Sequence, residues 1–250
     1  NLGLQVALYD LDSVRRAIAA EPGSATRNIG IRTPILHLAY SQEIHRRPDK
    51  SGDMLAIADL LRQAGADVDD GYAPDPEGDY KLAALYGAMC HADNFELGKW
   101  LLGQGANPND DESLYHSTEL GHTRALALRL KNGAKPDGTN ALPRALDFDN
   151  VEMVRLLLEA GADPNLTAPD HPSGQPMNTI PSLHQAARRG GSVEVVELLL
   201  KFGADPNAVW DGHTAHAMAC IYGNQVVADD LAGKGFAAAL DRNEAILSAC

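Results

Sequence analysis

Residues 151–165 read VEMVRLLLEAGADPN, and residues 193–207 read VEVVELLLKFGADPN. Eleven of the fifteen positions are identical between the two copies. Four apolar residues of the first copy fall at the 3.6-residue spacing of one helix face: Val151, Val154, Leu157 and Leu158. Gly161 can adopt the left-handed conformation that ends a helix, and Pro164 cannot continue one. An amphipathic helix with a fixed end, copied along the chain, predicts a repeat protein.

The glycine that ends this helix recurs along the chain, at Gly65, Gly105, Gly133, Gly161, Gly203 and Gly235. Before each glycine lies a leucine-rich segment that we predict to be helical, over residues 53–64, 95–104, 123–132, 151–160, 193–202 and 225–234. A shorter, alanine-rich helix precedes these segments, as in Leu183 to Ala187. Thr33 and Pro34 are the residue types of an N-cap and a first helical position, so they open one such helix. The sequence therefore predicts units of two helices each.

This two-helix unit resembles the ankyrin repeat over essentially the whole chain. The opening of the repeat is matched at Asp211 to Thr214, its first helix at Pro34, Leu36, His37 and Ala39 and again at Leu183, His184, Ala186 and Ala187, and its turn between helices at Gly121-His122 and Gly223-Asn224. One residue, Ile35, is extra in the first of these matches. The resemblance implies an all-α ankyrin-repeat solenoid of helix-turn-helix units, with short β-hairpin or loop fingers between them.

We expect a single domain over residues 1–250, because the repeats follow one another without a linker. The repeats run roughly over 1–29, 30–79, 80–109, 110–138, 139–176, 177–210 and 211–240, with a partial repeat at 241–250. In the first repeat, Leu2 to Tyr9 and Leu11 to Glu21 fit the two helices. A repeat buries its apolar surface only against its neighbours, so the final half repeat leads us to expect that the native chain continues past Cys250.

Five segments depart from the repeat pattern. The spacings from Gly105 to Gly133 and from Gly133 to Gly161 are 28 residues each, against about 33 in the family, so we expect two fingers reduced to tight turns. The next spacing is 42 residues, and its surplus predicts a projecting loop from Thr167 to Asn178. Residues 42–52 form an insertion that carries His45, Arg46, Arg47 and Lys50, and residues 71–79 predict a further finger.

Composition limits the possible partners and compartments. The net charge of −13 argues against nucleic acid and against anionic membranes, since a basic face supplies most of the affinity for phosphate. No apolar run approaches the ~20 residues of a membrane span, and the N-terminus has no signal-peptide pattern. Three cysteines are few and odd in number, so a disulfide framework is not expected. We therefore expect a cytoplasmic protein, and we expect it to be a monomer. Because aromatic residues make up only 5% of the chain, we expect its core to consist of Leu, Ala, Val and Ile.

The sequence offers no catalytic machinery. Cys90, Cys220 and Cys250 all fall on one repeat position that requires a small apolar side chain, so packing explains them. The resemblance implies that His37 and His184 are buried and hydrogen-bonded to backbone. His213 and His216 have a spacing seen in metal sites, but no third ligand is near in sequence. We therefore predict no enzyme activity, no cofactor and no metal.

Recognition of another protein remains, and the resemblance implies that it uses a concave surface of first helices and fingers. Residues that depart from the repeat consensus on that surface are Tyr80, Tyr86, His91, Tyr115, His116, Glu119, Arg144, Phe148, Gln185, Arg188, Arg189, Trp210, His213, Met218 and Tyr222. Interfaces favour Tyr, Trp, Phe, Met and Arg. The predicted partner-binding residues are therefore Tyr115, Phe148, Arg188, Arg189, Trp210, His213, Met218 and Tyr222. An alternative for Phe148 and Tyr222 is that they only cover a seam between repeats.

Three functional hypotheses follow. The first is a non-catalytic protein-protein interaction scaffold that binds a partner on its concave face over repeats five to seven, with a partner surface that is net basic around an apolar centre. The second is a targeting or regulatory arm of a longer enzyme or secreted effector, whose active domain lies outside these residues. The third and weakest is an enzyme site within the solenoid itself.

Overall fold

The computed structural model describes residues 1–75, 77–78, 80–110, 112–166 and 180–248. Contacts divide the chain into two compact units, residues 1–113 with 131–133 and residues 114–130 with 134–250. The predicted loop from Thr167 to Asn178 and the predicted packing of Cys250 fall outside the described residues. Every helix in the described ranges is too short or too polar to cross a bilayer.

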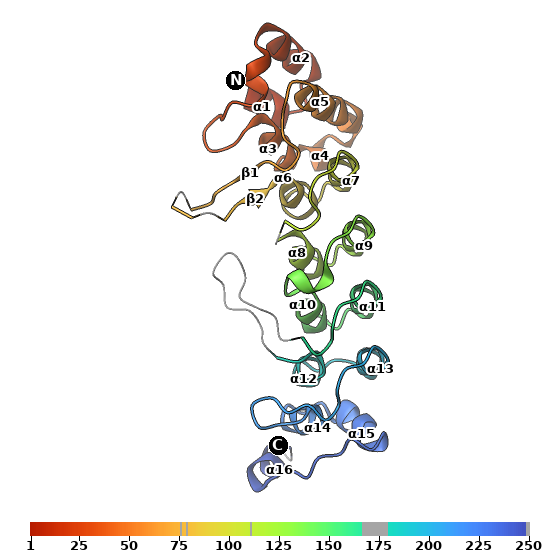
Figure 1. The fold of residues 1–250 in the computed structure, drawn as a ribbon. Helices are drawn as coiled ribbons and strands as arrows, with labels where there is room; N and C mark the ends of the chain where they lie inside the picture. The colour runs from red at the N-terminus through yellow and green to blue at the C-terminus, as the bar shows by residue number, and fades with distance from the viewer. Residues whose placement is uncertain (76, 79, 111, 167–179, 249–250) are drawn as a thin grey trace. The chain divides into compact units, whose positions relative to one another are not determined.

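The first unit contains pairs of antiparallel helices and one short hairpin (Figure 1). Its helices are α1 (Leu2–Ala7), α2 (Leu11–Ala20), α3 (Pro34–Ala39), α4 (Glu43–Arg46), α5 (Ser51–Gln63), α6 (Ala84–Tyr86) and α7 (Phe95–Gly103), with a π-helical turn, η3, at Gly87–His91 and 3-10 turns η1 at Pro22–Ala25 and η2 at Pro48–Lys50. Strands β1 (Gly71–Tyr72) and β2 (Leu82–Ala83) pair in antiparallel register. The predicted finger at 71–79 is thus the start of a β-hairpin.

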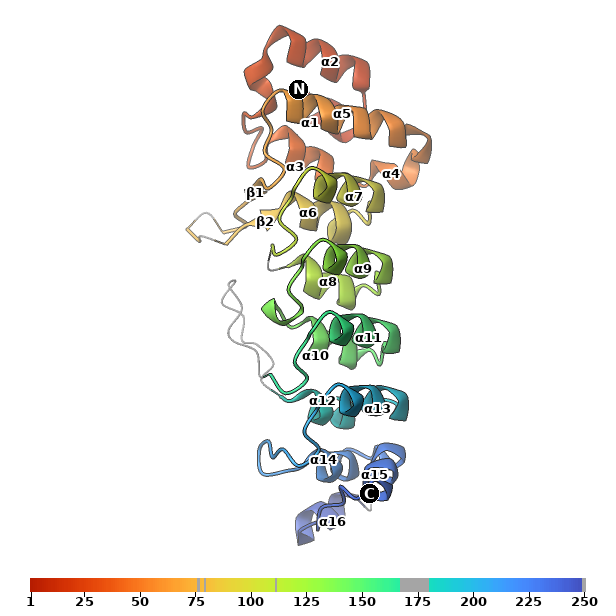
Figure 2. The same cartoon turned by 45° about the vertical axis from the view of Figure 1, so that its right-hand side comes forward.

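The second unit is a regular succession of helix pairs. The pairs are α8 (Ser113–Glu119) with α9 (Thr123–Lys131), α10 (Ala141–Asp147) with α11 (Val151–Glu159), α12 (Ser182–Arg188) with α13 (Val193–Lys201), and α14 (Ala215–Ile221) with α15 (Gln225–Gly233), followed by α16 (Arg242–Ser248); a 3-10 turn, η4, lies at Pro136–Gly138. α12 packs between α10 and α14, and α13 packs between α11 and α15. Figure 2 shows these as two rows, with the second helices α9, α11 and α13 in front of the first helices. This arrangement confirms the predicted all-α fold class.

Helix boundaries follow the predicted pattern closely. Each predicted second helix is present and ends within one residue of its predicted end. The six helix-ending glycines all have positive φ, between +88° and +99°, so each takes the left-handed conformation. Asn150 caps α11 by accepting a hydrogen bond from the Met153 backbone N–H at 3.1 Å. Thr33 precedes α3 as predicted but makes no side-chain cap, because its hydroxyl donates to Asp70 instead.

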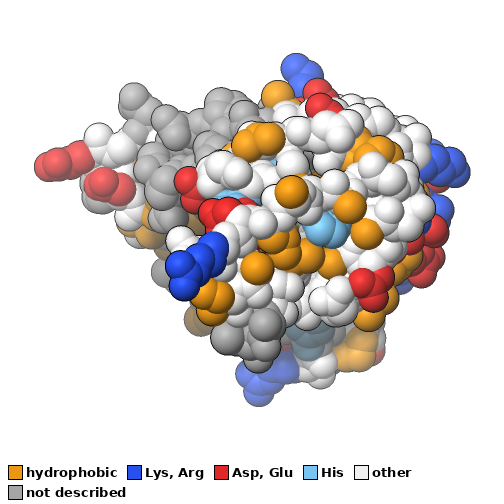
Figure 3. Space-filling model, turned by 90° about the horizontal axis from the view of Figure 1, so that it is seen from below, with side chains coloured by type: hydrophobic (Ala, Val, Ile, Leu, Met, Phe, Trp, Pro, Cys, Tyr) orange, Lys and Arg blue, Asp and Glu red, His pale blue; other side chains and the backbone are white. Residues whose placement is uncertain are grey.

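The core of the second unit lies between its two helix rows. It is built mainly of Leu, Ala and Val side chains that are nearly inaccessible to solvent. Met153 and Met218 are also buried there, so flexible thioether side chains join the Leu, Ala, Val and Ile residues that were predicted for the core. Seen from the α16 end, hydrophobic side chains reach the surface with charged ones at the edges (Figure 3). Ile246 and Leu247 of α16 are exposed, and they lie outside the candidate site described below.

The insertion at 42–52 is ordered by ion pairs and backbone contacts. It forms α4 and a 3-10 turn before α5 begins at Ser51. Arg47 pairs with Asp49 at 2.9 Å and Lys50 pairs with Asp53 at 2.6 Å. The ring Nε2 of His45 lies 2.7 Å from the Ala92 carbonyl oxygen of the next repeat. This basic segment therefore pairs largely within its own unit.

Candidate functional site

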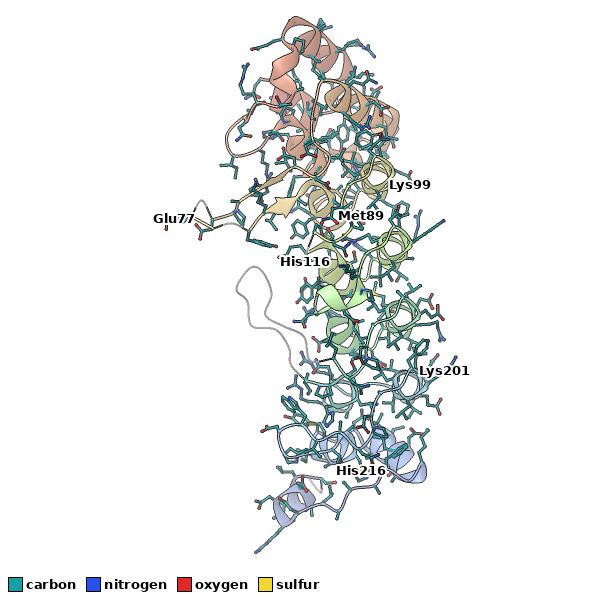
Figure 4. All side chains as sticks on the ribbon, viewed as in Figure 1. Glu77, Met89, Lys99, His116, Lys201 and His216 are labelled. Atoms are coloured by element: carbon teal, nitrogen blue, oxygen red, sulfur yellow. The ribbon has the colours of Figure 1, made fainter. Side chains whose placement is uncertain are left out.

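The first helices of the second unit carry a connected set of charged side chains. His116 lies on the side of α8 that faces away from α9, whereas Lys201 lies on the side of the second helices (Figure 4). His116 Nδ1 lies 2.7 Å from Glu119 Oε2 on the same helix. Glu119 Oε1 accepts a hydrogen bond from Arg144 Nη2 of α10 at 2.6 Å. The pair on α8 is thus linked to the next repeat.

The set continues from α10 to α12. Arg144 Nη1 donates to Asp147 Oδ2 at 3.1 Å. Asp147 Oδ1 accepts from Arg189 Nε at 2.8 Å and also from the Gln185 side-chain amide. Arg188 Nη2 in turn donates to Gln185 Oε1 at 2.9 Å. We name these seven residues the ion-pair ladder: His116, Glu119, Arg144, Asp147, Gln185, Arg188 and Arg189.

The spacing of the ladder within each helix explains its geometry. Residues three apart are neighbours on a helix surface. The first helices α8, α10 and α12 each supply one such pair at the same repeat position: His116 with Glu119, Arg144 with Asp147, and Gln185 with Arg188. Because adjacent first helices pack side by side, equivalent pairs meet across the repeats. The ladder therefore forms because the same two positions of neighbouring repeats lie next to each other.

Two carboxylates and one arginine of the ladder are stabilised in their charged forms. Burial tends to raise the pKa of Asp147, whose side chain is 12% exposed, but hydrogen bonds and charges from Arg189 and Arg144 outweigh burial and lower it. Burial likewise tends to raise the pKa of Glu119. Hydrogen bonds from Arg144 and His116 outweigh burial and lower that pKa. Burial tends to lower the pKa of Arg144, yet its bonds to both carboxylates raise it. These groups stay charged at neutral pH.

Aromatic rings flank the ladder. The Arg144 guanidinium carbon lies 4.9 Å from the ring centroid of Phe148 and 5.8 Å from that of Tyr115, within cation–π range. Tyr115 also stands edge-on to His116, with centroids 5.0 Å apart. Phe148 nevertheless keeps 52% of its surface exposed. It contacts Arg144 of its own repeat and still presents a ring to solvent.

One residue per repeat, directly after the first helix, points into solvent. These residues are Leu120, Phe148, Arg189 and Tyr222, and we name them the helix-end column. Each precedes a residue with positive φ: Gly121, Asp149, Gly190 and Gly223. The left-handed residue turns the chain toward the second helix, so the side chain just before it lies at the exposed end of the first helix. The column is exposed in all four repeats.

The structure places the predicted partner-binding residues in four different environments. Tyr115, Phe148, Arg188 and Arg189 belong to the ladder or flank it, and Tyr222 belongs to the column. Met218 is only 2% exposed and packs in the core, so its predicted contact with a partner is wrong. Its repeat position is the one that holds Arg144 in α10, but an unbranched apolar side chain there turns inward.

Trp210 and His213 form the turn that precedes α14. Their backbones exchange hydrogen bonds of 2.9 and 3.0 Å. His213 Nδ1 lies 2.6 Å from Glu244 Oε1 of α16, and Trp210 packs partly buried against the core. The His213 ring is therefore engaged within the chain, and its predicted contact with a partner is not favoured.

Asp147 was not among the predicted residues. It accepts hydrogen bonds from three side chains and joins two helices. The signal in the sequence is the spacing from Arg144 to Asp147, repeated as His116 to Glu119, which becomes informative only when the repeats are aligned. Interfaces favour aromatic and arginine side chains, so residue type alone does not predict an aspartate at this position as part of the site.

Two aromatic candidates of the first unit, Tyr86 and His91, belong to a different cluster, which forms around Tyr40. The Arg32 guanidinium carbon lies 4.1 Å from the Tyr40 ring centroid and 4.4 Å from that of Tyr72. Tyr86 and His91 lie 6.3 and 5.2 Å from the Tyr40 ring. Tyr80 donates to the Glu112 carboxylate. Because this cluster supplies its own cation, it serves packing of the hairpin and α3.

The other histidines and the cysteines support the fold. His37 Nε2 lies 3.0 Å from the Ile29 carbonyl oxygen, and His184 Nε2 lies 3.0 Å from that of His213. His184 is buried, as the resemblance implied, whereas His37 makes the implied backbone contact but is only half-buried. Cys90 and Cys220 are free thiols, each 6% exposed, which confirms their predicted packing role. In the part of the chain that the structure describes, no three His, Cys, Asp or Glu side chains cluster as a metal site requires.

Comparisons with known proteins agree with this repeat architecture. A family model for three copies of the ankyrin repeat matches residues 84–168, and a model for a single ankyrin repeat matches residues 182–211. The crystal structure of the human ASB11 ankyrin repeat domain is similar, with a TM-score of 0.66 and 22% sequence identity, over 96% of this chain and 99% of that chain. At this identity the likeness shows the fold. No curated protein sequence matches the chain.

Proposed function

The chain is an ankyrin-repeat protein, and from this premise we propose that it is a non-catalytic scaffold that binds a protein partner along its first helices α8, α10, α12 and α14. Ankyrin repeats are generally protein–protein interaction modules, which supports the class of function. The siting rests on one observation: the ion-pair ladder and the helix-end column lie together on these helices. Interfaces are enriched in the exposed Phe, Tyr and Arg side chains found there.

The ladder suits binding better than catalysis. A general base needs a pKa near the working pH, whereas the pKa values of Glu119 and Asp147 are lowered. Both carboxylates already accept hydrogen bonds on both oxygens. Their role is to fix arginine side chains in place, and fixed side chains lose less entropy when a partner binds.

The partner is proposed to be a protein rather than a nucleic acid, since the net charge of −13 repels phosphate. The free thiols of Cys90 and Cys220 accord with the proposed cytoplasmic location. The monomeric state stays a prediction. The hypothesis of a targeting arm for a distant catalytic domain has no observation in its favour.

A photocrosslinking experiment tests the siting. The photoreactive amino acid p-benzoylphenylalanine replaces Phe148 or Tyr222 in the full chain, expressed in the native cells and irradiated. We expect both positions to yield a crosslinked protein of discrete mass. The matched control replaces Val226, which is exposed on the second helix α15. Crosslinks from Val226 alone, or from no position, would contradict the proposal.

A further inference from the structure

The ion-pair ladder has more hydrogen-bond donors than acceptors. Each oxygen of Glu119 and Asp147 already accepts at least one hydrogen bond, and Gln185 Oε1 accepts one from Arg188. Each arginine carries five N–H donors. Arg188 and Arg189 each use a single nitrogen toward the residues that the structure describes. Their remaining donors are free for an outside acceptor.

The local charge has the opposite sign to that of the whole chain. Two carboxylates, Glu119 and Asp147, face three guanidinium groups, Arg144, Arg188 and Arg189, so the ladder carries +1 with His116 neutral, while the chain carries −13. The nearby Asp149 carboxylate is turned toward Ser192, accepting from its backbone N–H at 2.8 Å and its hydroxyl at 3.0 Å. The excess charge lies at the Arg188 and Arg189 end. The net charge alone favoured a basic partner, but charge complementarity at this surface favours an acidic one.

The helix-end column sets a spacing. Neighbouring packed helices lie roughly 8–10 Å apart, and an extended peptide advances about 3.3 Å per residue. One step along the column therefore matches about three peptide residues. Phe148, Arg189 and Tyr222 occupy three consecutive steps, with an exposed ring on each side of the arginine.

We propose that this surface binds an extended peptide segment of a partner protein in which an aspartate or glutamate is flanked, about three residues away on each side, by apolar residues. The carboxylate would accept hydrogen bonds from Arg188 and Arg189. The two apolar residues would contact Phe148 and Tyr222. This inference rests on the proposed function and specifies the chemistry of its partner.

Selection from a display library of random 12-residue peptides on the full chain tests the pattern. We expect enriched peptides to share a central Asp or Glu with apolar residues three positions to either side. Synthetic peptides of that pattern, labelled with a fluorophore, are then titrated. Enrichment of Lys- or Arg-centred peptides, of uncharged peptides, or of none would overturn the inference. So would a phosphoserine at the central position that binds more than about tenfold tighter than glutamate, since that would make a phosphopeptide the better occupant.

Variants assign the binding to the arginines. Arg188→Glu, which leaves the Arg189–Asp147 contact intact, should weaken the selected peptide at least about tenfold. Arg188→Gln should weaken it less, and it serves as the second variant if the charge reversal perturbs folding. The matched control is Arg155→Glu on α11, an exposed arginine paired with Glu152 and Glu194 at 3.7 and 3.8 Å. Equal affinity for Arg188→Glu and wild type would sink the inference and leave the proposed function to the crosslinking result.

Discussion

Asp147 receives hydrogen bonds from three side chains that belong to α10, α12 and the residue after α12: Arg144, Gln185 and Arg189. A carboxylate that is nearly removed from water is costly unless its oxygens are satisfied. Here the two oxygens of Asp147 accept three side-chain hydrogen bonds, so the charge stabilises the contact between neighbouring repeats. At the scale of a residue, Asp147 is the position on which the arrangement of the arginines depends.

Replacing Asp147 by asparagine should therefore lower the free energy of unfolding by about 1–3 kcal/mol. The amide presents one acceptor and turns two donors toward guanidinium groups. Urea unfolding followed by circular dichroism measures the change. Glu152→Gln is the control, because Glu152 is 62% exposed and its pair with Arg155 spans 3.7 Å, so it should alter stability by under about 0.5 kcal/mol. Equal losses in the two variants would contradict this role.

The same carboxylates predict how stability depends on pH. Their pKa values are lowered in the folded chain, from ordinary values of 3.8 for Asp147 and 4.5 for Glu119. The unfolded chain therefore binds more protons in acid, and the stabilisation present above pH 4.5 is lost as the pH falls through the folded values. We expect the unfolding free energy of the wild type to fall more steeply below pH 4.5 than that of Asp147→Asn. Parallel acid profiles would refute the assignment.

At the scale of an element, the π-helical turn η3 is the clearest departure from repeat geometry. It occupies Gly87–His91, where the pattern predicts a plain first helix. A Cβ on Gly87 would stand 2.4 Å from the ring of Tyr40, and that ring is only 7% exposed. The absence of a side chain at Gly87 lets η3 approach the end of α3 closely, where Tyr40 lies.

Gly87→Ala should cost about 1–3 kcal/mol of stability, because the buried ring of Tyr40 cannot yield without moving its neighbours. Gly103→Ala is the matched control: Gly103 is also helical and a Cβ there would meet nothing within 4 Å. That change should be neutral or stabilise by up to about 1 kcal/mol. Thermal unfolding of both variants provides the comparison, and similar midpoints would argue against the close approach.

The elements were largely predictable and the surface only partly so. Helix ends depend on local chemistry, so Gly161 and its copies located them within a residue. Which way a side chain turns depends on its neighbours in the adjacent repeat. Met218 and Arg144 share a repeat position, yet one is buried and the other joins the ladder. Asp147 acquires its importance only when the next helix brings Arg189 to it, and no single segment contains that information.

At the scale of the whole molecule, stability is distributed between neighbouring repeats. α11 packs against α10 and α13, and its Leu157 is fully buried. In repeat proteins the energy is approximately a sum of repeat terms and nearest-neighbour interfaces. A defect in one repeat should therefore weaken the adjoining repeats most.

Leu157→Ala should destabilise its surroundings by about 2–5 kcal/mol, through lost burial and the cavity that remains. Native-state hydrogen exchange resolves where the loss falls. We expect amides of α10 and α13 to lose more protection than amides of α3 in the first unit. A uniform loss across all helices would show instead that the chain opens in one cooperative step.

The helix-end column has a consequence for how new specificity can arise. Its four side chains are solvent-facing because the next residue, and not the side chain itself, turns the backbone. Exchange of Leu120 or Tyr222 leaves the hydrogen bonds of the ladder intact, so these two positions can vary at little cost in folding. Arg189 and Phe148 are more constrained, because Arg189 donates to Asp147 and Phe148 packs against Arg144. This repeat position already holds four different residue types, in Leu120, Phe148, Arg189 and Tyr222. A library varied at Leu120 and Tyr222 alone would sample many binding preferences while the ladder stays in place.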